Sequence, residues 1–181
     1  MFKSSIPGGK LAAVLRTDPS APLPVKRAAQ AMYVGAAVSA VSLLISVASS
    51  FSLKSELISA NTANLADGKV TMSQIDSVAN AEIVSTIVVG IVAVALWIWM
   101  AKKNGIGRGW ARISSTVFFG LWTIYAYINV SSLKGGVNVT AGFLISFGLM
   151  LATWAVGAVT IYHLWRPVST VYFKEQASLQ R

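Results

Sequence analysis

The chain has 181 residues, of which 55 % are apolar and 12 % are charged, and its net charge is +9. Soluble domains carry roughly a quarter charged residues, so this composition indicates a membrane protein with little room for a separate soluble domain. The lack of cysteine excludes disulfides, thiolate metal sites and cysteine nucleophiles, and a single histidine, His163, argues against a histidine-built metal centre. Because no nucleophile–base set or phosphate loop is present, we expect no enzymatic activity, no cofactor and no metal.

Residues 1–27 predict a flexible N-terminal tail. Three closely spaced prolines interrupt a helix there, namely Pro19, Pro22 and Pro24. The apolar stretch LAAVL is too short for the core of a secretory signal, so we expect no cleaved leader. A solvated linker is the simpler interpretation of this tail, and a partner-binding arm is the alternative.

Four uncharged apolar segments follow, and each is long enough to cross about 30 Å of hydrocarbon as a helix. They cover residues 31–53, 83–101, 113–133 and 139–165. The connection between the second and third segments is short, which makes these two helices antiparallel neighbours. We therefore predict an all-α, polytopic integral membrane protein in which residues 28–166 form a four-helix transmembrane bundle.

Two polar segments lie outside these spans. Residues 54–81 form a long polar connection, in which Thr71 and Gln74 resemble a capping box and predict a helix start near Thr71. Residues 167–181 are interpreted as a short polar C-terminal tail.

The basic residues predict the orientation of the chain. Twelve of the fifteen Lys and Arg residues lie in the two terminal tails and in the connection between the second and third spans. The opposite side carries Lys54, Lys69 and Lys134. Because positively charged segments stay in the cytoplasm, we predict that both termini are cytoplasmic and that residues 54–81 are extracellular.

Small residues recur along one face of the first span. They are Gly35, Ser39, Ser42, Ser46 and Ser49. Their period of about 3.5 residues keeps them on one side of a left-handed helix pair, where small side chains allow close approach. We predict that this seam, and Gly157 in the fourth span, pack helices together. The alternative is a polar path lined by the serines.

The strongest candidate interaction site is the connection between the second and third spans. It carries Lys102, Lys103, Arg108 and Arg112, with Trp110 among them. Each basic residue near a membrane surface contributes about 1 kcal/mol to the attraction of anionic lipids. The alternative is that these residues only set the orientation. We interpret the remaining polar candidates as interfacial residues, namely Glu82, His163, Tyr125, Tyr127 and Asn129.

Three stretches of the chain have a distinctive sequence, namely VKRAAQAMYVGAAVSAVSLL, LWIWMAKKNGIGRGWARISSTVFF and LWRPVSTVYF. Together they resemble a group of uncharacterised four-span membrane proteins of actinobacteria. The resemblance covers roughly residues 20–175. It implies a bacterial origin and residence in the inner membrane, and it carries no activity with it.

Two functions remain as hypotheses. The first is a non-enzymatic accessory protein of the inner membrane, which binds anionic lipids, a membrane-protein partner or further copies of itself, and no nucleic acid. The second is a small oligomeric transporter or channel for a small solute. The lack of ionisable residues in the cores of the four spans favours the first, because ion and proton pathways usually carry such residues.

The predicted orientation is testable with reporter fusions. A reporter that is active only in the cytoplasm should be active when fused after Arg181, because most of the positive charge lies on that side. A periplasmic alkaline phosphatase reporter inserted after Asp67 should be active as well. The opposite pattern of activities would reverse the orientation.

Overall fold

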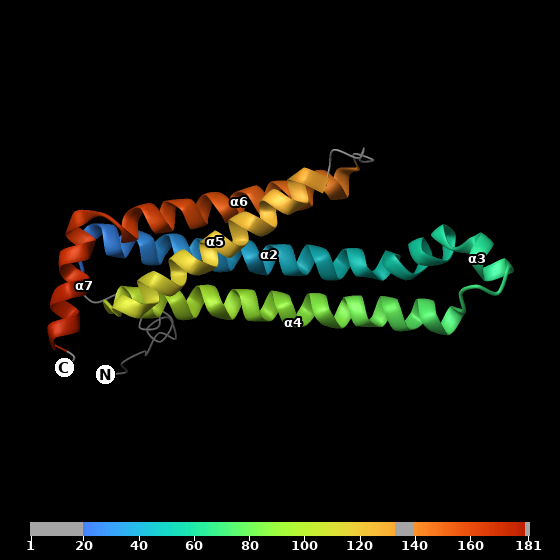
Figure 1. The fold of residues 1–181 in the computed structure, drawn as a ribbon, viewed down its shortest axis with the longest axis horizontal. Helices are drawn as coiled ribbons and strands as arrows, with labels where there is room; N and C mark the ends of the chain where they lie inside the picture. The colour runs from blue at the N-terminus through green and yellow to red at the C-terminus, as the bar shows by residue number, and fades with distance from the viewer. Residues whose placement is uncertain (1–19, 133–139, 180–181) are drawn as a thin grey trace, which may run out of the picture. The chain divides into compact units, whose positions relative to one another are not determined.

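The structure is a computed structural model that describes residues 20–132 and 140–179 (Figure 1). Every regular element in this described part is a helix: α2 (Leu23–Ala60), α3 (Thr62–Ala66), α4 (Met72–Gly105), α5 (Gly109–Ser132), α6 (Ala141–Leu164) and α7 (Pro167–Leu179). Four of them, α2, α4, α5 and α6, are long and apolar enough to cross a membrane. The predicted all-α class and the four spans are therefore confirmed, whereas the orientation remains a prediction.

The first two long helices extend well beyond their apolar cores. Helix α2 begins at Leu23, inside the segment predicted as a tail, because Pro24 falls in the first turn, where a missing N–H costs nothing. The amide of Lys26 donates to the Pro22 carbonyl at 3.2 Å and closes this turn. Residues 1–19 of the predicted tail lie outside the described residues.

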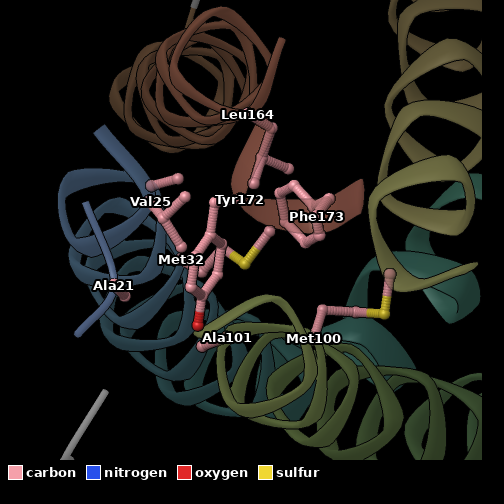
Figure 2. Packing of buried hydrophobic residues seen from close by; sticks show 9 residues of the cluster. Ala21, Val25, Met32, Met100, Ala101, Leu164, Tyr172 and Phe173 are labelled. Atoms are coloured by element: carbon pink, nitrogen blue, oxygen red, sulfur yellow. The ribbon is translucent and has the colours of Figure 1, made fainter. Parts of the chain in front are cut away.

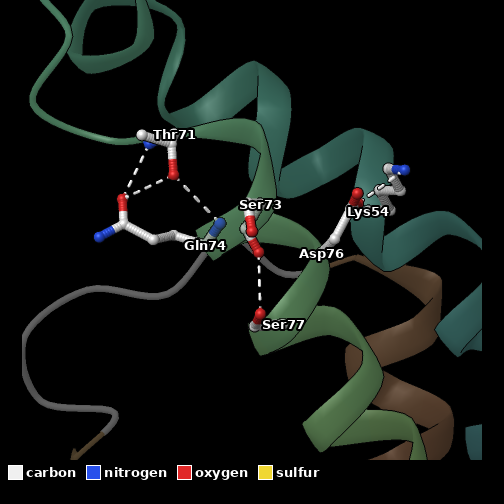
Figure 3. Close-up of polar contacts among 6 residues, drawn as sticks. All are labelled: Lys54, Thr71, Ser73, Gln74, Asp76 and Ser77. Atoms are coloured by element: carbon white, nitrogen blue, oxygen red, sulfur yellow. Dashed lines mark hydrogen bonds and ion pairs between the residues drawn. The ribbon is translucent and has the colours of Figure 1, made fainter.

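The polar connection predicted for residues 54–81 is mostly helical. Helix α2 continues to Ala60, and α4 starts at Met72, where the capping box predicted it. The Thr71 amide donates to Gln74 Oε1 at 2.8 Å, and the Gln74 amide donates to Thr71 Oγ1 at 3.3 Å (Figure 3). These reciprocal bonds satisfy two amide groups that a helix start would otherwise leave without partners.

The described chain divides into two units, each of which has its own packing. The second unit covers residues 36–96 and pairs the middle of α2 with α4. A Cβ on Gly90 would stand 2.5 Å from Leu43 Cδ1, so this glycine allows the two helices to approach closely. Lys54 and Asp76 form an exposed ion pair at 2.7 Å between the same two helices (Figure 3).

The first unit covers residues up to 35 together with residues 97–181, and it contains the hydrophobic core. We use the name basic end for the start of α2, the end of α4, the start of α5, the end of α6 and helix α7. The core cluster of the basic end draws side chains from most of these segments (Figure 2). Its largest members are Val25, Met32, Met100, Leu164, Tyr172 and Phe173.

Most of the segment interpreted as a short polar C-terminal tail forms helix α7, which covers residues 167–179. Tyr172 and Phe173 are buried against the core, and Ser169 Oγ donates to the His163 carbonyl at 2.8 Å. A proline at the first helical position starts the helix without a lost hydrogen bond. Residues 180 and 181 lie outside the described residues.

Gly107 lets α7 lie directly over the connection between α4 and α5. Its φ of +76° is a conformation that glycine adopts without steric cost. A Cβ there would stand 2.6 Å from Gln176 Cγ and 2.9 Å from Tyr172 Cε1. The close approach of α7 therefore depends on this residue having no side chain.

Two glycine-to-alanine variants separate these effects. Gly107→Ala should lower the free energy of unfolding by about 1–2 kcal/mol from its backbone conformation and by about 1–3 kcal/mol more from overpacking against α7. Gly68→Ala shares the positive φ, at +67°, but has no atom within 4 Å of the added Cβ, so only the backbone term applies. Unfolding in mixed micelles measures both. Equal losses would mean that α7 does not pack on Gly107.

Candidate functional site

Charge is distributed very unevenly between the two units. Among the described residues, the first unit carries eight Lys and Arg side chains and one acid, Glu175. The second unit carries two lysines and four acids, and the two ion pairs that the structure describes, Lys54–Asp76 and Lys69–Asp67, both lie there. The basic end therefore has a large excess of positive charge that its own acids do not balance.

The residues predicted to contact anionic lipids all belong to the basic end, but they lie at different depths. Lys102 and Arg108 are exposed and Lys103 is half-buried, at the end of α4 and just before α5. Trp110 is exposed, and its ring lies 5.1 Å from that of Trp99, which is also exposed. Exposed tryptophans of this kind suit the boundary between hydrocarbon and headgroups.

Arg112 differs from the other basic residues because it is buried. Only 8 % of it is exposed, in the first turn of α5. Its Cζ lies 3.7 Å from the centre of the Trp165 ring and 5.6 Å from that of Phe173. Its Nε is enclosed and has no hydrogen-bond partner, and no acidic side chain of the described chain pairs with it. Among the described residues, the rings of Trp165 and Phe173 thus supply the strongest contacts of this guanidinium.

Trp165 is held in place by a second contact. Its Nε1 donates to Thr116 Oγ1 at 2.9 Å, and the same hydroxyl donates to the Arg112 carbonyl at 3.0 Å. The indole at the end of α6 is therefore bonded to α5 one turn beyond the arginine that it covers. This bond fixes the ring against which Arg112 stacks.

Asn104 is a structural residue of the basic end that the sequence analysis did not single out. It is fully buried, and its Nδ2 donates to the Met100 carbonyl at 3.0 Å and to Ser115 Oγ at 2.9 Å. The Ser115 hydroxyl in turn donates to the Ala111 carbonyl at 2.9 Å. In the sequence, Asn104 follows two lysines and precedes a glycine, which is a pattern typical of an exposed helix end. The sequence therefore gives no sign that Asn104 is buried.

The predicted packing seam is only partly buried. Gly35 is buried under the ring of Trp97, and Gly157 faces the ring of Phe119, so both glycines allow close contacts between helices. Ser39 and Ser42 are half-buried, and Ser42 Oγ donates to the Val38 carbonyl at 2.9 Å. Ser46 and Ser49 are exposed, so the seam does not extend to them.

The other polar candidates do not converge on a site within one chain. Tyr125, Tyr127 and Asn129 are exposed on α5, and Asn129 Nδ2 donates to its own helix at the Tyr125 carbonyl. Glu82 is also exposed. In the second unit, an open hollow of about 520 Å³ lies beside Asn61 and the start of α4, and none of its described lining side chains has an enclosed polar atom without a partner.

No protein-family model, curated protein or solved structure matches the chain. The assignment of a function therefore rests on the geometry and charge of the basic end.

Two asparagine variants test the role of Asn104. Asn104→Ala should lower the free energy of unfolding by about 1–3 kcal/mol, because it removes a buried link between α4 and α5. Asn129 also donates to the carbonyl four residues earlier but is exposed, so Asn129→Ala should change stability by no more than about 0.5 kcal/mol. Unfolding in mixed micelles compares them, and similar losses would contradict a special role for Asn104.

Proposed function

We propose that the protein is a small, non-enzymatic component of the bacterial inner membrane that binds acidic membrane components through its basic end. These components are anionic lipids and the acidic surface of a membrane-protein partner. The described part of the first unit carries eight basic side chains and one acid, and this imbalance supports the proposal most directly. Opposite charges on a ligand would supply the balance that the chain lacks.

The exposed positions of Lys102 and Arg108 suit such a role. At a membrane surface, each is expected to contribute about 1 kcal/mol to the attraction of acidic headgroups. The neighbouring exposed indoles of Trp99 and Trp110 are suited to anchoring this end at headgroup depth. In the predicted orientation, all these residues face the cytoplasmic leaflet, whose anionic lipids give it a negative surface potential.

Lipid that co-purifies with the full chain tests the proposal. Protein extracted in a neutral detergent should retain anionic phospholipid in excess of its share in the source membrane. The double variant Lys102→Gln/Arg108→Gln should weaken this binding by about 2 kcal/mol in total, at about 1 kcal/mol for each charge. Quantitative lipid analysis of the purified proteins measures the effect.

The double variant Lys54→Gln/Lys69→Gln is the matched control. It removes the same positive charge from the second unit, where both lysines pair with acids, and should retain the lipid enrichment. A second experiment, chemical cross-linking in native membranes, detects protein partners and further copies of the chain. A monomer with neither enriched anionic lipid nor a cross-linked partner would contradict the proposed function.

A further inference from the structure

Arg112 differs from the exposed basic residues because side chains from two other helices cover it. The residue is only 8 % exposed, and its guanidinium lies against the rings of Trp165, from the end of α6, and Phe173, from α7. Trp165 is itself held by Thr116, as described above. Three helices therefore cooperate to fix one cation, whereas Lys102 and Arg108 lie on the surface.

No counter-charge faces the fixed cation among the residues that the structure describes. In the described part of the first unit the only acid is Glu175, which is exposed on α7 and forms no ion pair with Arg112. Burying a charge without a partner is strongly unfavourable, and aromatic stacking offsets only part of that cost. The Nε is enclosed and has no hydrogen-bond partner among the described residues, so it is out of reach of a ligand and adds to the cost of burial. The missing counter-charge indicates an anionic ligand that binds at the Nη edge of the guanidinium.

Stacking determines how such a ligand would approach. The Cζ atom of Arg112 lies over the Trp165 ring, so the ring blocks that side of the guanidinium and an anion must approach from another side. The planar fork of guanidinium N–H donors matches two oxygens of one phosphate group. Trp165 remains 50 % exposed, so the pair formed by Arg112 and Trp165 lies at the surface of the protein. The start of α5, with its positive end of the helix dipole, also favours an anion.

The position of Arg112 among exposed tryptophans indicates the source of the phosphate. The three exposed indoles of the basic end, Trp99, Trp110 and Trp165, are suited to the headgroup layer, where phospholipid phosphates are the most abundant anions. We propose that Arg112, stacked on Trp165, is a discrete binding site for the phosphate of one anionic phospholipid headgroup. This inference rests on the proposed function and adds a single defined site to a general attraction.

The test measures binding of the first lipid to the full chain by native mass spectrometry in a neutral detergent. The ligands are dioleoylphosphatidylglycerol, dioleoylphosphatidylcholine, dioleoylglycerol and inorganic phosphate. We expect saturable binding of one phosphatidylglycerol, at least tenfold weaker binding of phosphatidylcholine and no saturable binding of dioleoylglycerol. Inorganic phosphate alone should bind at least a hundredfold more weakly than phosphatidylglycerol, because it lacks the acyl chains that contact the apolar surface of the helices.

Three variants identify the residue responsible. Arg112→Gln should weaken binding of the first phosphatidylglycerol at least fiftyfold. Arg108→Gln, which removes the same charge from an exposed position, should weaken it only about fivefold, in line with its share of about 1 kcal/mol. Arg112→Lys keeps the charge but loses the planar fork, so it should fall between these values. The lysine variant also provides a test if the glutamine variant does not fold, and thermal melts identify the folded proteins.

The outcomes separate the discrete site from the proposed function. Equal weakening by Arg112→Gln and Arg108→Gln, with phosphatidylglycerol still preferred, would overturn the discrete site and leave the general function intact. Binding of inorganic phosphate as tight as that of the lipid would overturn the headgroup as its source. An equal affinity for phosphatidylglycerol and dioleoylglycerol would overturn the discrete site and the lipid part of the proposed function together.

Discussion

Hydrocarbon offers no hydrogen-bond partners, and this constraint shapes the backbone and most of the polar side chains of the four long helices. The backbone satisfies its own donors and acceptors as α-helix. Hydroxyls within the spans turn back to the carbonyl four residues earlier, as Ser42, Thr123 and Thr153 do at 2.8–2.9 Å. Longer polar groups reach a neighbouring helix instead, as Trp154 Nε1 does at Thr123 Oγ1. Polar residues can therefore occupy these spans without forming a polar path.

The same constraint explains why the ionisable groups gather at the ends of the helices. The apolar middle of each span leaves no place for a charge, and the acids and bases separate to different units of the described chain. In the second unit they meet as exposed ion pairs, which contribute little to stability. At the basic end they are almost all of one sign, so the stability of that end depends on apolar packing, hydrogen bonds and aromatic stacking.

Much of this fold was predictable from the sequence, because long uncharged runs and a capping box are local signals. The four spans and the start of α4 at Met72 follow from such signals. Helix α7 does not, because its segment mixes polar residues with Tyr172 and Phe173 and is buried only by distant parts of the chain. The candidate site could not be predicted from the sequence for the same reason. Nothing local distinguishes buried Arg112 from exposed Arg108, since Trp165 and Phe173 lie more than fifty residues further along the chain.

The burial of α7 against the start of α2 has a consequence for biosynthesis. Val25 and Met32 are among the first described residues to leave the ribosome, and Tyr172 and Phe173 are among the last. Contacts so distant in the chain cannot form until α7 itself has been translated. The core of the basic end is therefore completed only after all four spans have been made.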